Sequence, residues 1–157
     1  MSQAVFVLKV GLSGCEDIWR RIAVRGSQTL DDLHEAIFDA FDRYDEHLYS
    51  FYFPKPGSRG RARKRDGKEY TSSVMAEEES AFGEDDAPGN AEDTRMDSLG
   101  LKPRRKFHYL FDFGDEWWHD ITVEQIDAPA ERGKYPRILQ KQGESPPQYP
   151  DSDEMDD

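Results

Sequence analysis

Bulky apolar residues recur at every second position near the start of the chain, a spacing that predicts β-strand. In residues 4–12 the bulky positions are Phe6, Leu8, Val10 and Leu12. Residues 18–24 form a second such segment, in which Ile18, Ile22 and Val24 share one face. Ser13-Gly14 lies between the two segments and suits a turn. We therefore expect a β-hairpin.

The apolar spacing becomes helical after residue 29. From Leu30 onward, one stripe at 100° per residue holds Leu33, Ile37, Phe41 and Tyr44, and acidic residues fill the opposite side. Thr29 suits the N-cap, and Asp32 three residues later completes a short capping box. The pattern predicts an amphipathic helix packed on a sheet. His34 lies beside this stripe, which indicates a buried core histidine.

Three further strands are predicted downstream, at 48–53, 106–113 and 117–126. Between them, residues 55–93 change from a basic to an acidic stretch with little periodicity, apart from a short strand expected near 69–73. Residues 96–101 suit one helical turn, and the Pro-rich segment 135–150 suits an extended chain. Together these elements predict an α+β fold: an antiparallel β-sheet with an amphipathic helix packed on one face and a long charged insertion loop. We expect one domain over 1–150, with 55–93 as a mobile charged loop and 151–157 as a disordered acidic tail.

The aromatic segment between residues 107 and 124 predicts the register of the last hairpin. A two-residue turn would place charged side chains opposite the aromatic face, and a slip of one residue exchanges the faces of a strand. We therefore expect an odd loop of three or five residues that places Phe111 opposite His119 and Phe113 opposite Trp117. His119 then points inward, whereas Asp112 and Trp118 share the other face. A direct Asp112–His119 pair is not expected.

Composition and charge limit the cellular compartment and the classes of partner that we expect for this protein. The 157 residues carry a net charge of −12, which disfavours nonspecific binding to nucleic acid or anionic membranes. The one basic cluster lies in 55–68, so nucleic-acid binding is predicted only through that segment. Cys15 is the only cysteine, and no signal-peptide pattern or membrane-length apolar run occurs. We expect a cytoplasmic protein that does not enter a membrane and is a monomer.

Several short motifs, taken in order, resemble one known protein family. They are Ile18-Trp19-Arg20-Arg21, Leu30-Asp31-Asp32-Leu33-His34, His47-Leu48 with Phe51, Tyr109 with Asp112-Phe113-Gly114-Asp115-Glu116-Trp117 and His119, and Tyr135-Pro136-Arg137 with Pro146-Pro147. The chain is similar over 4–53 and 94–150 to the plasmid pRiA4b ORF-3-like family, also labelled an insertion-element passenger TnpR protein.

The resemblance implies an α+β fold and an association with mobile genetic elements, but no established activity. The TnpR label suggests a resolvase, yet the sequence has no recognisable nucleophilic Ser–Arg arrangement and no helix-turn-helix. Many members carry cysteines around the late Pro-Pro motif, where this chain has Ile138 and Ser145. Trp118 stands where the family usually has an acid, and the loop 55–93 is longer than usual.

Seven polar or aromatic residues are the candidates for a ligand or ion-pair cluster. They are Arg20, Arg21, His47, Asp112, Asp115, Trp118 and His119. Arg20 has inward parity, so it belongs to an anion site with Arg21, to a structural ion pair with Asp112 or Asp115, or to a strand bulge. His47 suits a helix C-cap contact or a ligand, and Asp115 suits a turn. Trp118 forms either a contact surface or a surface covered by the Pro-rich segment.

No spacing in the chain requires a metal, and we predict no metal site, no cofactor and no catalytic residue. His-Glu-x-x-His and i, i+4 histidine pairs are missing from the sequence. The leading hypothesis is a noncatalytic accessory domain that contacts a protein partner through the acidic helix face or the Trp118 surface. The alternative is an enzyme or binding protein for an anionic ligand or nucleic acid, with Arg20, Arg21, Asp112, Asp115 and His119 in one cleft.

Overall fold

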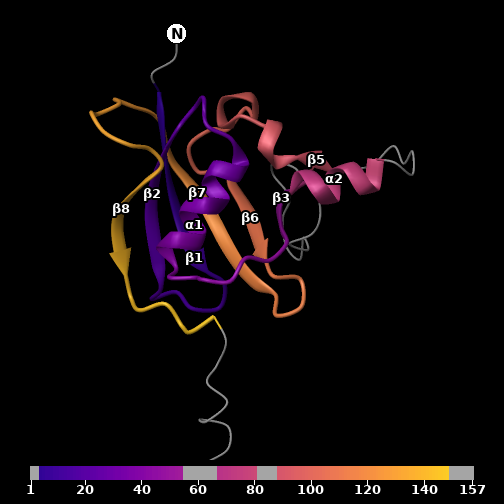
Figure 1. The fold of residues 1–157 in the computed structure, drawn as a ribbon. Helices are drawn as coiled ribbons and strands as arrows, with labels where there is room; N and C mark the ends of the chain where they lie inside the picture. The colour runs from indigo at the N-terminus through magenta and orange to yellow at the C-terminus, as the bar shows by residue number, and fades with distance from the viewer. Residues whose placement is uncertain (1–3, 55–66, 81–87, 149–157) are drawn as a thin grey trace, which may run out of the picture.

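The computed structural model describes residues 4–54, 67–80 and 88–148, and the fold is given for these ranges. Their strands form one eight-stranded sheet in the order β5-β4-β3-β6-β7-β1-β2-β8. Neighbours are antiparallel except for β4 and β5, which are parallel. The strands are β1 (Val5–Leu12), β2 (Trp19–Arg25), β3 (Tyr49–Phe53), β4 (Lys68–Thr71), β5 (Gly89–Asn90), β6 (Lys106–Phe111), β7 (Trp117–Ala128) and β8 (Arg137–Gln142). The described chain is therefore β-rich, and α1 (Leu30–Ala40) lies across one face of the sheet (Figure 1).

The predicted hairpin and helix start are confirmed. β1 pairs with β2 in antiparallel register, with Leu8 opposite Ile22. At the start of α1, the Thr29 side chain accepts a hydrogen bond from the Asp32 backbone N–H, and the Asp32 carboxylate accepts one from Thr29 N–H. This reciprocal pair satisfies two backbone donors that the first helical turn leaves open.

The helix is shorter than its apolar stripe predicted. α1 ends at Ala40, and Asp42 adopts a positive φ of 57°, which turns the chain out of the helix. Asp tolerates this left-handed conformation better than most residues. Tyr44 is therefore 71% exposed instead of continuing the stripe, whereas Phe41 remains in the core.

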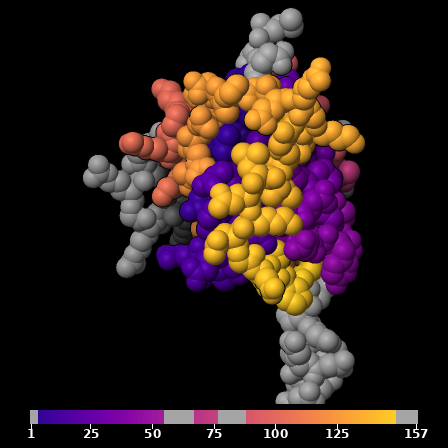
Figure 2. All heavy atoms as spheres, turned by 90° about the vertical axis from the view of Figure 1, so that its left-hand side faces the viewer, coloured from indigo at the N-terminus to yellow at the C-terminus, as the bar shows by residue number. Residues whose placement is uncertain are grey.

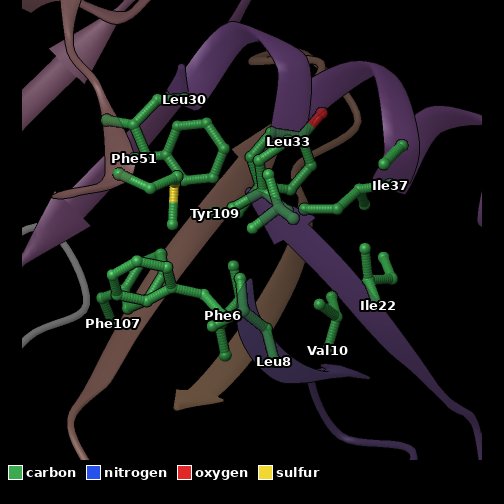
Figure 3. Close-up of a cluster of buried hydrophobic side chains, with 14 of the residues drawn as sticks. Phe6, Leu8, Val10, Ile22, Leu30, Leu33, Ile37, Phe51, Phe107 and Tyr109 are labelled. Atoms are coloured by element: carbon green, nitrogen blue, oxygen red, sulfur yellow. The ribbon is translucent and has the colours of Figure 1, made fainter. Parts of the chain in front are cut away.

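The core fills the space between α1 and the near face of the sheet. Leu30, Leu33 and Ile37 of α1 point toward side chains of β1, β2, β3 and β6, as Figure 3 shows. Phe51, Phe107 and Tyr109 stand at its centre and are fully buried. Phe53 and Phe107 stack with ring centroids 4.4 Å apart, a contact that adds to the area they bury.

The last hairpin has the predicted faces but a register shifted by two residues. Phe111 pairs with Trp117, and Tyr109 pairs with His119, in place of Phe113 with Trp117 and Phe111 with His119. The parity is unchanged, so the aromatic residues and His119 still share the core face. β6 ends at Phe111 because Asp112 has a positive φ of 65° and begins a five-residue loop.

Residues 55–93, predicted as one mobile charged loop, contain regular elements where the structure describes them. β4 pairs with β3, α2 (Ser73–Ser80) follows, and β5 precedes the 3-10 turn η1 (Ala91–Asp93). The β4 position agrees with the short strand expected near 69–73. Residues 55–66 and 81–87, with most of the basic cluster, lie outside the described residues, as does the predicted acidic tail.

Part of the late Pro-rich segment is a strand. β8 pairs with β2 and forms one edge of the sheet. Figure 2 shows this segment and the residues after it lying over the side of the molecule, between α1 and the N-terminal strands. The second 3-10 turn, η2 (Met96–Ser98), occupies the position of the predicted helical turn. Among the described residues, no helix combines the length and apolar character that crossing a membrane requires.

Candidate functional site

Arg20 is buried on the α1 side of β2, as its parity predicted, but no carboxylate among the described residues pairs with it. Its guanidinium donates to the backbone oxygens of Ala40, Trp19 and Gln142 and to Ser145 Oγ, each at 2.8 Å. Burial lowers the pKa of Arg20, and the charge of Asp42 opposes that shift. Arg20 therefore joins the end of α1 to β8 and the segment after it, and the predicted ion pair with Asp112 or Asp115 is wrong.

Arg21 lies on the opposite face of β2. Its Nε donates to Glu124 Oε1 at 2.6 Å, and it also contacts the Gln140 side chain. This hydrogen bond raises the pKa of Arg21, whereas burial lowers it to a smaller extent. Because the sheet separates Arg20 from Arg21, the two do not form the predicted anion site.

Arg43 is a buried cation that the helical pattern did not single out. It follows the positive-φ residue Asp42, so its position depends on where the helix stops. Its guanidinium lies over the rings of Phe41, Phe111 and Trp117, with centroid distances of 5.1–5.5 Å, a cation–π arrangement. Its Nη2 lies 3.0 Å from His119 Nε2, whereas Nη1 is buried without a hydrogen-bond partner. Burial lowers the pKa of Arg43 to about 10.

His119 is fully buried on the core face, as predicted, and is the hydrogen-bond acceptor for Arg43. Burial and the neighbouring Arg43 charge lower the pKa of His119 to about 3, so the imidazole is neutral near neutral pH. With Nε2 accepting from Arg43, Nδ1 carries the proton and faces the Tyr109 carbonyl at 3.4 Å. The ring is thus held by the core and does not open onto a cleft.

His34 begins a second buried polar chain beneath α1. Its Nδ1 lies 2.6 Å from the Tyr109 hydroxyl, and its Nε2 lies 3.3 Å from Glu46 Oε2 and 4.0 Å from Glu35 Oε1. Burial lowers the pKa of His34 to about 3 and raises that of Tyr109 well above its ordinary value. The Glu46 carboxylate can only accept, so its contact suits the tautomer with the imidazole proton on Nε2, and Nδ1 then accepts from the Tyr109 hydroxyl.

The grouping of His34, Glu35 and Glu46 has the residue types of a metal site. In the tautomer that the Glu46 carboxylate favours, however, Nε2 carries a proton and offers no lone pair to a metal. The arrangement therefore fits a hydrogen-bonded chain better than a set of metal ligands.

The β6–β7 loop is organised by Asp112. Its Oδ1 accepts from the backbone N–H groups of Gly114 and Asp115, at 3.0 and 3.2 Å, an Asx-type turn. Its Oδ2 lies 3.5 Å from His47 Nε2, and Asp45 flanks His47 on another side at 3.6 Å. His47 thus bridges two loops instead of capping α1. Asp112 has left the strand, so it does not share a face with Trp118, whereas Asp115 is exposed in the turn as predicted.

The face of the sheet opposite α1 carries a hollow of about 1140 Å³. Its floor includes Gly11 of β1, where an added Cβ would meet no atom closer than 3.8 Å. The absence of a side chain at an outward strand position leaves this space open. Trp19 and Asp120 line it from the neighbouring strands, and Lys9 Nζ lies 4.8 Å from the Trp19 ring centroid.

A second hollow of about 520 Å³ adjoins the first at the end of the sheet, and residues Leu12, Gly14 and Cys15 line both. Its apolar lining includes Trp117, Trp118 and Pro146, and its acidic lining is Asp115 and Glu116. Trp118 Nε1 donates to Glu116 Oε1 at 3.2 Å, which holds that carboxylate beside the indole. Ser13 Oγ and Trp117 Nε1, from two other lining residues, are buried and have no hydrogen-bond partner within the described part of the chain.

Trp118 lies on the outer face, as predicted, with its ring centroid 5.7 Å from that of Tyr52. Of the described residues of the Pro-rich segment, Pro146 alone lines this hollow, and Trp118 is half-buried. Trp19 and Gly11 were not predicted as site residues. Their outward parity and the unusual glycine within a strand were the available signals.

The predicted Arg/Asp/His cleft is not formed. Arg20 and His119 are buried on the α1 face, Arg21 lies on the outer face, and Asp112 stabilises a loop, so these side chains do not open onto one pocket with Asp115. Both hollows are instead lined by tryptophan. All three tryptophans of the sequence, Trp19, Trp117 and Trp118, line this pair of joined hollows, which we call the tryptophan surface.

These features define a β-rich domain in which one helix covers one sheet face and a hollowed, tryptophan-lined surface lies on the other. The chain belongs to the plasmid pRiA4b ORF-3-like protein family, whose pattern matches residues 4–151. The uncharacterized protein y4hQ of Sinorhizobium fredii (strain NBRC 101917 / NGR234) is 32% identical over 149 residues, covering 94% of this chain and 67% of the relative. The crystal structure of MM3350, a protein of unknown function from Methanosarcina mazei Go1, has a similar fold: TM-score 0.70 at 25% identity, over 94% of this chain and 74% of that one.

Proposed function

We propose that this protein is a noncatalytic interaction module that holds an extended segment of a partner protein on the tryptophan surface. The observation that carries the proposal is the position of its tryptophans. Trp19 and Trp118 line two joined hollows on the outer face, although tryptophan is a large apolar residue that a core would accommodate. Trp117 adjoins the second hollow, but its ring packs toward the core, over Arg43. Tryptophan is enriched among the residues that dominate binding energy at protein interfaces.

The shape of the surface favours a polypeptide over a compact small molecule. The larger hollow, of about 1140 Å³, slightly exceeds the range of ordinary ligand pockets, and the second hollow continues it around the end of the sheet. An extended chain could place successive side chains in the two hollows. The buried donors of Ser13 and Trp117 lie at the second hollow, where small side-chain movements would allow them to pair with a bound backbone.

The histidines support a noncatalytic role. His34 and His119 are neutral and buried in the core, so neither is placed as a general base for a molecule bound outside. His108 lies on the outer face and contacts Asp120 at 2.9 Å, but no serine, threonine or cysteine of the described residues hydrogen-bonds to its ring. A nucleophile activated by a histidine would need that contact.

A nucleic-acid partner is less well supported. The joined hollows are lined by five carboxylates, those of Glu16, Asp17, Asp115, Glu116 and Asp120, against the single ammonium group of Lys9. This charge repels phosphate. A nucleic-acid function would have to use the basic segment 55–68, most of which lies outside the described residues. Association with mobile elements likewise remains a prediction from the family resemblance.

Selection from a random peptide library displayed on phage tests the proposal. Peptides enriched on the wild-type protein should bind at least about tenfold more weakly to the Trp19→Ala/Trp118→Ala double variant, since interface tryptophans often contribute 2 kcal/mol or more. Leu139→Ala is the matched control, because Leu139 is an exposed apolar residue on β8, away from the tryptophan surface. Enrichment of no peptide, or of peptides whose binding the double variant leaves unchanged, would contradict the proposal.

A further inference from the structure

We infer that a small monovalent anion, such as chloride, binds in the core beside Arg43, with the Arg43 guanidinium and the Trp117 indole N–H as its donors. Arg43 follows the end of α1, and only 6% of this residue is exposed. Arg43 Nη1 and Trp117 Nε1 are both buried and have no hydrogen-bond partner within the described part of the chain. The guanidinium lies 5.1 Å from the Trp117 ring centroid, so the two unpaired donors belong to neighbouring side chains.

Arg43 is a buried cation without a counter-charge beside it. Its pKa of about 10 leaves it protonated at neutral pH, and no carboxylate among the described residues forms an ion pair with it. The one hydrogen-bond partner of its side chain in these ranges is His119, whose imidazole is neutral because its pKa is about 3. A buried charge is costly to the folded state unless it is both paired and hydrogen-bonded. The surroundings of Arg43 therefore call for one negative charge.

The aromatic rings around Arg43 do not supply that charge. The faces of Phe41, Phe111 and Trp117 attract the cation, at centroid distances of 5.1–5.5 Å. A ring face is a weak acceptor for an N–H group, however, and a buried donor left unpaired in a native protein is commonly explained by a bound water or ion. A water molecule would pair with Nη1 but leave the charge uncompensated, whereas an anion would do both.

The surroundings of the donors limit the size and the charge of the anion. Arg43 lies among packed rings, where only a monatomic or similarly small ion fits. Trp117 stands between Arg43 and the second hollow, and the carboxylates of Asp115 and Glu116 line that hollow. Their charge repels a multivalent anion such as phosphate more strongly than a monovalent one. A single negative charge is also what balances the guanidinium.

Sodium chloride titration, followed through the three indole ¹⁵N–¹H signals, tests the site in solution. Sodium gluconate keeps the ionic strength constant, because gluconate is a monovalent anion too large to enter a packed core. Single tryptophan-to-phenylalanine variants assign the signals. We expect a saturable shift of the Trp117 signal and little change at Trp19 and Trp118. A shift that grows without saturating, or a Trp117 signal that does not respond to chloride, would overturn the anion site.

Arg43→Met removes the charge but keeps an unbranched side chain in the core. It should weaken chloride binding at least about tenfold, because hydrogen bonds to charged groups are the strong ones. Arg21→Met is the matched control, since it makes the same change in charge on the outer face, and it should leave the affinity within about twofold. The thermal midpoint of each variant shows whether it is folded. Undiminished chloride binding by folded Arg43→Met, or equal losses in both variants, would overturn the site.

Crystals of the wild-type protein grown with sodium bromide test the position without any substitution, so the test holds even if Arg43→Met does not fold. Bromide should give an anomalous difference peak within hydrogen-bond distance of Arg43 Nη1 and Trp117 Nε1. Density without an anomalous signal would identify a water molecule and overturn the site. A bromide peak without a saturable chloride shift in solution would mean an adventitious ion only, with the same consequence. None of these results depends on peptide binding at Trp19 and Trp118, so the anion site and the proposed function fail separately.

Discussion

The two faces of the sheet differ in whether their polar groups are buried and paired or lie at the surface. On the α1 face, Arg20, His34, Arg43 and His119 are buried and most of their polar atoms have partners within the core. On the outer face, charged side chains surround tryptophans and glycine that leave open hollows. A conspicuous buried charge in this protein is therefore part of its architecture, whereas the less conspicuous outer face has the features of a binding surface.

The largest expected effect comes from Arg20 on the α1 face. Arg20→Ala should lower the free energy of unfolding by about 3–5 kcal/mol, because it leaves a cavity and removes donors to three backbone oxygens and a hydroxyl. Urea denaturation measures the change. Arg21→Ala is the matched control, with the same charge change in a partly exposed ion pair, and should cost less than about 1 kcal/mol. Equal losses of stability in the two variants would show that buried and exposed arginines of β2 do not differ in structural importance.

The second-largest effect is expected from acid, which should lower the free energy of unfolding through the buried histidines on the α1 face. The pKa values of His34 and His119 are about 3 in the folded protein against an ordinary value of 6.5, so between these values the unfolded chain binds protons that the folded chain does not. Stability is therefore complete above pH 6.5 and falls as the pH drops toward 3, by an amount on the order of several kcal/mol. The raised pKa values of Glu35 and Glu46 act in the opposite direction and reduce the loss.

Urea denaturation at a series of pH values measures this dependence, and His119→Gln separates the contribution of His119. Glutamine retains a hydrogen-bond acceptor for Arg43 but does not titrate, so the slope of stability against pH should become shallower in this window. An unchanged slope would show that His119 does not carry the effect.

A smaller effect is expected where the two faces meet, at the β6–β7 loop. Asp112→Ala removes the acceptor for the backbone N–H groups of Gly114 and Asp115 and should cost about 1–2 kcal/mol. Asp112→Asn keeps an oxygen at that position and should cost less. Thermal unfolding of both variants, with Asp115→Ala as an exposed control, measures the difference. If Asp115→Ala lost more stability than Asp112→Ala, the turn would be stabilised by the Asp115 carboxylate and not by that of Asp112.

The sequence predicted the faces of the strands better than it predicted their contacts. Alternation placed Arg20 and His119 inward and Trp118 outward, because strand parity depends only on local spacing. The partners of Arg20 could not be predicted in the same way. They are backbone oxygens of Ala40 and Gln142, which approach Arg20 only after α1 and β8 have packed.

Other features depended on where elements stop. Asp42 and Asp112 adopt positive φ, which ends α1 before Tyr44 and shifts the hairpin register by two residues. Side-chain periodicity does not report such a backbone change, so Arg43, which directly follows Asp42, was missed. β8 was missed because it is an edge strand whose residues are mostly exposed and polar, and its pairing with β2 is a long-range contact.

The smallest expected effect concerns Trp118, and it tests the outer face directly. Trp118→Ala should lower the free energy of unfolding by no more than about 1 kcal/mol, because the ring is only half-buried and lies on the outer face, where it contacts the Tyr52 ring. A tryptophan in a packed core would cost about 3–5 kcal/mol on the same substitution. Urea denaturation with an unchanged slope against denaturant makes the comparison, with Phe107→Ala as the core reference on the α1 face. A loss of stability as large as that of Phe107→Ala would mean that Trp118 has a structural role. That result would count against the tryptophan surface as a binding site.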